Sequence, residues 1–211
     1  LNLAFPNREG FGPATRSGDF TEILVSDFIE SVLDFWVPRT RYRLKQIPNE
    51  SPKGPDIVGM KFESGPTKHR PNDALLTFEV KASMAIKNEN RLQHAIDDAK
   101  KDAFDDIHTG DARGAFRVGL TLNALKHRFI DVDDNRGWKA VERFQDPIAR
   151  PYVHRIGASA VFCTSAFDEK AIKEVTTAAY PHGTKLLLVV VKGEEMMRII
   201  HVMDERAADG A

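Results

Sequence analysis

Cysteine is nearly absent from this sequence, and it contains no long apolar run. Cys163 is the only cysteine among 211 residues, so no intrachain disulfide can form and the paired cysteines of common zinc sites are missing. We therefore expect a cytoplasmic protein that folds on its hydrophobic core alone. The longest apolar runs, such as KLLLVVV, are far shorter than a membrane span, and no basic-then-apolar leader opens the chain, so we expect no membrane association.

An excess of charge of either sign is also lacking. The formal net charge of -1 argues against a surface covered in cations, so any contact with nucleic acid must come from a local cluster. In PRTRYRLKQ, four cations stand at every second position and would share one face of a strand: Arg39, Arg41, Arg43 and Lys45. This face is either a contact for a nucleic-acid backbone or a solvated strand edge whose charges prevent aggregation.

Signatures of several enzyme classes are missing as well. The sequence has no P-loop, no GxSxG and no HExxH, which argues against nucleotide hydrolysis by this chain alone and against a zinc site. In DVDDNRGWKAVE, acidic and amide residues occupy four ligand positions of an EF-hand, namely Asp131, Asp133, Asn135 and Glu142. Arg136 stands where the sharp turn of that loop needs glycine, so we expect an acidic surface loop rather than a calcium site.

The chain shows no internal repeat and no linker-like stretch, which predicts one domain over 1–211. Its core is expected over about 19–110, and the segment 155–204 is expected to complete the sheet. The apolar spacing in DFTEILVSDFIESVLDFW predicts a helix that begins with Asp19 as its N-cap and ends before Pro38.

Strand-like and helix-like segments then alternate along the chain. Three strands are predicted over about 40–47, 56–63 and 75–83, the last two joined in a long hairpin by SGPTKHRPND. The later segments are a helix over 88–107, a helix over 115–130, a strand over 158–165, a helix over 167–180, and strands over 185–193 and 196–203. This order predicts an α/β protein of mixed α+β type, in which helices flank a mixed central sheet.

Charged residues occur within two strands that otherwise read as buried. Glu79 and Lys81 would project from one face of their strand, and Asp56 begins the neighbouring strand of the hairpin, where pairing could bring it close to Glu79. Two carboxylates that close repel each other unless a cation lies between them. Oxygen ligands of this kind suit magnesium or manganese. The alternative is a solvent-facing Glu79–Lys81 ion pair, with Asp56 as a turn residue.

These residues form a recognisable pattern. Pro55-Asp56, followed after 22 residues by Glu79-Val80-Lys81, resembles the PD-(D/E)xK nuclease motif. The restriction-endonuclease-like core of that superfamily has the order αβββαβ, as predicted here. Within it, GDFTEILVSDFIE, KGPDIVG and FEVKAS resemble the HamA-type nuclease subunit of Hachiman anti-phage defence systems.

The resemblance implies a role for individual residues. Asp56 and Glu79 would bind magnesium or manganese, and Lys81 would orient the attacking water or stabilise charge on the phosphate. Glu22 matches an acidic residue that many members contribute as a further metal ligand, although its spacing also fits a capping box that closes the helix start. Gln93 resembles a glutamine found near the active site of many members, although it could simply border an apolar stripe.

The function implied is metal-dependent hydrolysis of DNA by a defence effector that works with a helicase partner. The basic strand from Arg39 to Lys45, with Lys68 and Arg70 in the hairpin loop, would contact the DNA backbone. An RNA nuclease would use the same chemistry. The alternative from a different class is a non-catalytic module that keeps the fold and binds a partner protein or nucleic acid.

Overall fold

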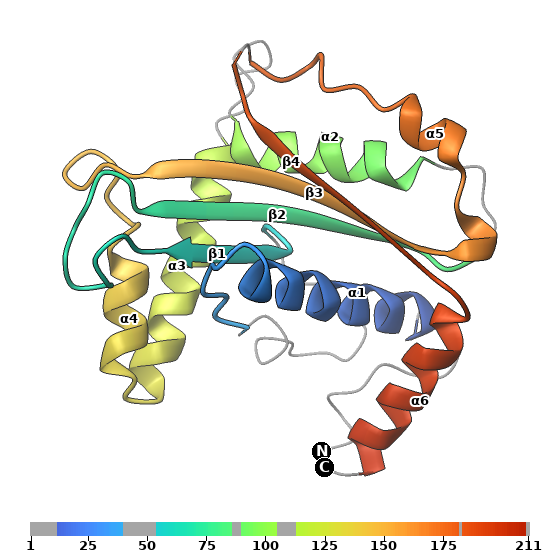
Figure 1. Ribbon diagram of the computed structural model, residues 1–211. Coiled ribbons are helices and arrows are strands. Elements are labelled where there is room, and N and C mark those ends of the chain that lie inside the picture. The colour runs from blue at the N-terminus through green and yellow to red at the C-terminus, as the bar shows by residue number, and fades with distance from the viewer. Residues whose placement is uncertain (1–11, 40–53, 86–89, 105–112, 182, 210–211) are drawn as a thin grey trace.

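The structure is a computed structural model that describes residues 12–39, 54–85, 90–104, 113–181 and 183–209. Its elements are α1 (Gly12–Ser31), β1 (Ile57–Lys61), β2 (Ala74–Ser83), α2 (Arg91–Ala103), α3 (Arg113–Asp131), α4 (Asn135–Glu142), β3 (Val153–Cys163), η3 (Thr164–Ala166), α5 (Glu169–Lys173), β4 (Leu186–Gly193) and α6 (Met196–Asp209). The strands form one sheet in the order β1-β2-β3-β4, in which β1 is antiparallel to β2, and β2, β3 and β4 are parallel. This mixed sheet flanked by helices (Figure 1) confirms the predicted fold class and is consistent with a restriction-endonuclease-like core.

Strand β2 lies in the middle of the core because helices cover both of its faces. Leu76 and Phe78 pack on one face with Val25 and Ile29 of α1. Leu75 points to the other face, into a cluster built largely from α3 and α4, and α2 covers β3 on that same side. Burial on both faces explains why β2 reads as a nearly continuous apolar run rather than as an alternating one.

A glycine in β3 lets the central aromatic side chain of the core fit against the sheet. Gly157 is the pairing partner of Phe78 on β2, and the Phe78 ring is fully buried. A Cβ atom at Gly157 would lie 2.0 Å from the Phe78 ring, closer than atoms can pack. Glycine is therefore required there for β3 to lie beside β2.

Most predicted elements are present, with shifted ends. The first helix begins at Gly12 and ends at Ser31, earlier at both ends than predicted. Its C-terminal end is early because the chain turns at Asp34, whose φ is +58°. Trp36 then forms an isolated antiparallel bridge with Met60 of β1. The strand predicted over 40–47 lies outside the described residues.

Three local predictions are wrong. The segment 196–203 is not a strand but the start of α6, whose Met196 and Ile200 are buried four residues apart, as in a helix that packs along one stripe. The helix predicted over 167–180 is reduced to the five residues of α5. The expected acidic loop is helix α4, whose N-cap Asp134 accepts hydrogen bonds from the backbone of Arg136 and Gly137.

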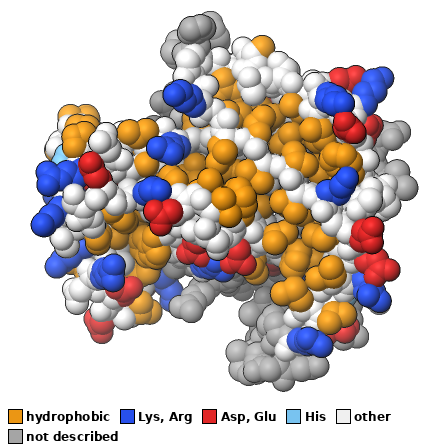
Figure 2. Space-filling model, viewed as in Figure 1, with side chains coloured by type: hydrophobic (Ala, Val, Ile, Leu, Met, Phe, Trp, Pro, Cys, Tyr) orange, Lys and Arg blue, Asp and Glu red, His pale blue; other side chains and the backbone are white. Residues whose placement is uncertain are grey.

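Exposed apolar side chains gather on one face of the molecule. Figure 2 shows them over β4 and α6, where Leu188, Val190, Ile199, Val202 and Met203 are each more than one-third exposed. Within the described part of the chain, no helix is both long enough and apolar enough to cross a membrane.

A buried ion pair joins the β1–β2 hairpin to α4 and to the start of β3. Asp73 and Arg143 are 0% and 3% exposed, and the Arg143 Nε atom lies 2.8 Å from Asp73 Oδ2. Arg143 also donates to the carbonyl oxygens of Arg70 and Arg150. The Asp73 carboxylate accepts hydrogen bonds from the backbone N–H groups of Glu63 and Arg70. Both charges are thus surrounded by polar partners, which is the condition under which a buried pair is tolerated.

We predict that Arg143→Met destabilises the protein by about 3–5 kcal/mol, because it leaves Asp73 buried without its countercharge. The free energy of unfolding, measured in urea, checks this. Lys173→Met is the matched control, since Lys173 pairs with Glu169 at an exposed position of α5, and it should cost about 1 kcal/mol or less. Equal losses in the two variants would contradict the structural role of the buried pair.

Candidate active site

The candidate site lies where β2 runs past the end of β1. Pairing with β1 covers only residues 74–78 of β2, and β2 continues to Ser83. Beyond Phe78, β2 is therefore not paired with β1. Glu79 and Lys81 fall in this overhanging part of the strand.

Asp56 is held directly before β1 by a constrained turn. Gly54 has a φ of +107°, which favours glycine, and a Cβ atom there would lie 2.4 Å from the Thr121 hydroxyl oxygen. Because Ile57 pairs with Phe78, Asp56 comes opposite Glu79.

Hydrogen bonds join Asp56 to the overhanging part of β2. The backbone N–H of Val80 donates to Asp56 Oδ2 at 2.8 Å, and the backbone N–H of Asp56 donates to Glu79 Oε1 at 3.3 Å. The structure thus brings together two carboxylates that are 23 residues apart.

Lys81 lies beside this pair and is held by a residue of α2. Its Nζ atom is 3.5 Å from Glu79 Oε2 and 2.9 Å from Asp98 Oδ2. Asp98 also pairs with Lys101, one turn further along α2. The Lys81 ammonium is therefore fixed between the carboxylate pair and the helix that packs on β2 and β3.

Burial dominates the electrostatics of the carboxylate pair. Glu79 is 5% exposed; burial raises its pKa, and the nearby Asp56 carboxylate raises it further, whereas Lys81 lowers it, with a net pKa of about 10. For Lys81, burial lowers the pKa, but the Asp98 hydrogen bond and the Glu79 and Asp56 charges raise it above its ordinary value. The directions of these pKa shifts favour a proton on Glu79 and a positive charge on Lys81.

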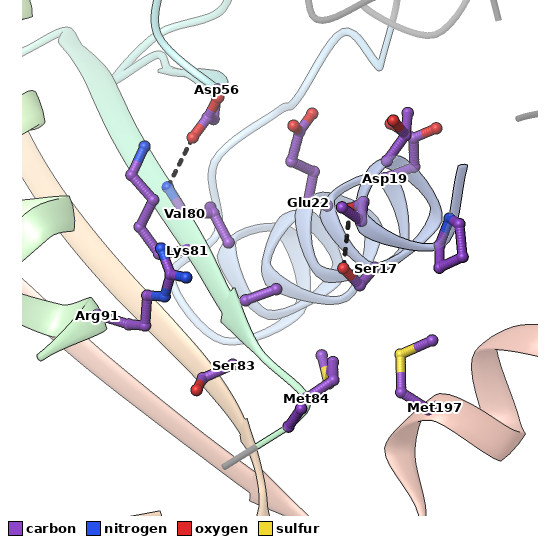
Figure 3. Close-up of a pocket in the computed structure, with 16 residues that line it drawn as sticks. Ser17, Asp19, Glu22, Asp56, Val80, Lys81, Ser83, Met84, Arg91 and Met197 are labelled. Atoms are coloured by element: carbon purple, nitrogen blue, oxygen red, sulfur yellow. Dashed lines mark hydrogen bonds between the residues drawn. The ribbon is translucent and has the colours of Figure 1, made fainter. Parts of the chain in front are cut away.

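Asp56 and Lys81, but not Glu79, line a cleft of about 620 Å³ between α1 and the overhanging part of β2. Figure 3 shows Asp56 and Lys81 on the strand side of the cleft, and Glu22 and Asp19 on α1. Arg91, at the start of α2, also lines the cleft.

Glu22 reaches this cleft because it does not cap its helix. Helix α1 begins at Gly12, so neither Asp19 nor Glu22 lies at the helix start, and the capping-box alternative is wrong. The two residues are three apart and share one face of α1. Among the described residues, however, no group of three or more His, Cys, Asp or Glu side chains is arranged to hold a metal ion. The expected set of three carboxylates is thus not assembled: Asp56 and Glu79 meet, whereas Glu22 lines the cleft with Asp56 but not with Glu79.

Gln93 does not line the cleft. Its side-chain amide donates to Asp97 and to the carbonyl oxygen of Thr176, and its carbonyl oxygen accepts from the Thr176 backbone N–H at 2.8 Å. These bonds fasten α2 to the segment that follows α5. Gln93 therefore links α2 to the segment after α5 and lies outside the cleft.

Of the cations expected to contact nucleic acid, the three that the structure describes are not gathered at the site. Arg39 is outside any strand and forms ion pairs with Asp27 and Glu30 of α1. Lys68 and Arg70 are exposed in the hairpin turn, about 17 Å of strand from Glu79, because the turn of a hairpin lies opposite its open end. The remaining members of the basic cluster, Arg41, Arg43 and Lys45, lie outside the described residues.

Sequence reasoning missed several residues of the site. Asp19 is predicted as the N-cap of the first helix, but the structure places it inside α1, where its three-residue spacing from Glu22 puts both on one helix face. Asp98 carried a weaker signal, as an acidic residue beside the buried stripe of α2. No sequence signal indicates Met197 as a site residue, because the pattern of residues 196–203 predicts a strand.

We predict that the contribution of Glu79 to the stability of the metal-free protein is lost as the pH rises from about 4.5 toward 10. Over this range the unfolded chain releases the Glu79 proton, whereas the folded protein keeps it, since burial and Asp56 raise the folded-state pKa to about 10. Glu79→Gln cannot ionise, so its free energy of unfolding should exceed that of the unchanged protein by a margin that grows with pH.

Urea unfolding with EDTA at pH 6 and pH 9 measures this margin. Glu63→Gln, a change of the same type at an exposed residue, is the control and should keep the pH dependence of the unchanged protein. A margin that stays constant between the two pH values for Glu79→Gln would contradict the raised pKa.

Comparison with models of known protein families gives a match over nearly the whole chain. The family model described as HamA matches residues 1–207, which is nearly the whole chain. No curated protein matches the sequence. The match includes both strands of the hairpin and the helix that faces them, and it agrees with the resemblance seen in the motif residues. The chain therefore belongs to the HamA family, a component of Hachiman anti-phage defence.

Proposed function

We propose that this protein is a metal-dependent nuclease that hydrolyses phosphodiester bonds in DNA as the effector of its defence system. The observation that carries the proposal is the meeting of the Asp56 and Glu79 carboxylates beside the Lys81 ammonium. A buried, mutually repelling pair of carboxylates is costly unless something offsets its charge. A catalytic cation is the partner that this arrangement fits.

Asp56 and Glu79 would hold a magnesium or manganese ion, since both supply hard oxygen ligands, and such ions commonly bind through one or two carboxylates plus a phosphate. When bound, the ion would act as a Lewis acid toward the phosphate and lower the pKa of a water molecule. Glu22 lines the same cleft as Asp56 and Lys81, and it would be a further acidic group near the ion.

Lys81 would supply positive charge next to the scissile phosphate. Its raised pKa keeps the ammonium protonated at neutral pH, so it would stabilise negative charge that builds on the phosphate. Asp98 holds Lys81 at 2.9 Å, which limits the movement of the ammonium before DNA binds.

The charge distribution favours delivery of DNA by another subunit. The net charge is -1, and among the described residues Arg39, Lys68 and Arg70 do not line the cleft. Sequence-independent affinity for DNA comes mainly from cations that neutralise phosphates. Within this proposal, a helicase partner would present the strand and restrain cleavage until it engages DNA.

Plasmid cleavage tests the proposal. With a helicase partner present to separate the strands, we predict cleavage in magnesium or manganese and none in EDTA. Glu79→Ala and Lys81→Ala should each lower the rate by at least about 100-fold, the size expected when charge stabilisation is removed from a catalytic site. Glu169→Ala and Lys173→Ala remove an exposed Glu–Lys pair on α5 and should cleave at the unchanged rate. Intact plasmid under every condition, with a helicase partner present, would favour the non-catalytic binding module instead.

A further inference from the structure

The cleft has two ends of different chemistry. One end carries Asp19, Glu22, Asp56 and Lys81. The other end is apolar: Figure 3 shows Met84, which directly follows β2, and Met197 of α6 facing the same space from opposite sides. The proposed hydrolysis uses only the charged end, so the methionine end has no assigned role.

The distance between the charged end and the methionine end of the cleft is suited to one nucleotide. Met84 lies three residues beyond Lys81, which corresponds to about 10 Å along an extended chain. The cleft volume of about 620 Å³ falls within the roughly 300–1,000 Å³ of pockets that bind small ligands. A phosphate beside Lys81 would thus leave its base within reach of the methionine end.

Methionine side chains suit the flat face of a nucleobase. Their thioethers are polarisable and flexible, and they make favourable contacts with aromatic rings. Arg91, at the start of α2, also lines the cleft and adds a cation suited to a phosphate oxygen. The cleft therefore offers charged side chains for the phosphate of a nucleotide and apolar side chains for its base.

We propose that Met84 and Met197 bind the base of an unstacked nucleotide, so that the protein acts on single-stranded DNA. The inference rests on the proposed function for the position of the phosphate. A base inside a duplex is paired and stacked on both sides, so it can enter a cleft between a helix and a strand only after leaving the stack. Single-stranded DNA presents its bases already unpaired, and proteins bind them on apolar or aromatic side chains.

Binding to the full chain tests this inference. The probes are a fluorescein-labelled oligothymidylate, a hairpin duplex of the same length, and a same-length oligomer in which every base is replaced by tetrahydrofuran, all in calcium. We predict that oligothymidylate binds more tightly than the duplex, and that Met84→Ala and Met197→Ala each weaken its binding about tenfold. Neither substitution should change binding of the baseless oligomer.

Met203→Ala is the matched control. Met203 lies on α6 like Met197, is 52% exposed and does not line the cleft, so its substitution should leave binding unchanged. A second measurement needs no substitution. The chain has five methionines, and their labelled methyl groups give few enough NMR signals to follow individually. Oligothymidylate should shift the signals of Met84 and Met197 and leave that of Met203 in place.

The inference is overturned if the duplex binds as tightly as oligothymidylate, if both cleft variants bind like Met203→Ala, or if neither cleft methyl signal shifts. Its failure is distinguishable from failure of the proposed nuclease. Metal-dependent cleavage that is lost in Glu79→Ala but unaffected by Met84→Ala and Met197→Ala removes the base site and keeps the nuclease. Base-dependent binding without any cleavage keeps the base site and removes the nuclease.

Discussion

The antiparallel register of β1 on β2 is the constraint on which the candidate site depends. Ile57 pairs with Phe78, so Asp56 is placed opposite Glu79 at the point where β1 ends and β2 continues. A slip by one residue would turn every β1 side chain to the other face of the sheet and separate the two carboxylates. The register is secured at both ends: Gly54 sets the entry turn, and the buried Asp73–Arg143 pair holds the hairpin turn. The same strand register therefore determines both the packing of the core and the geometry of the site.

The cost of burying like charges explains much of the site's local structure. Glu79 is almost fully enclosed, and its neighbour Asp56 opposes its ionisation. The protein offsets this with backbone N–H donors to both carboxylates and with the Lys81 ammonium, which Asp98 in turn holds. These groups moderate the repulsion without removing it, because Glu79 keeps a raised pKa. The arrangement favours a cation and disfavours an empty, fully ionised site.

Local sequence patterns predicted the parts of the fold that depend on short-range rules. The hairpin, the two core helices and the meeting of Asp56 with Glu79 follow from alternation, helical spacing and turn residues. Prediction was wrong for residues 196–203, because a short apolar run fits a strand or a helix equally well and tertiary packing decides between them. The same limit hid Met197, whose place in the cleft depends on how α6 lies beside α1. Asp19 is misplaced because the predicted helix start lies about two turns after the observed start at Gly12.

A crystal soaked in manganese tests the central claim most directly. The account predicts an anomalous peak between Asp56 and Glu79, with an oxygen of each carboxylate at about 2.0–2.2 Å, close to the distance seen for magnesium. In a crystal of Glu79→Ala, that peak should be lost. A well-ordered site with no peak between the two carboxylates, or with manganese bound elsewhere in the cleft without contact to either, would contradict the account.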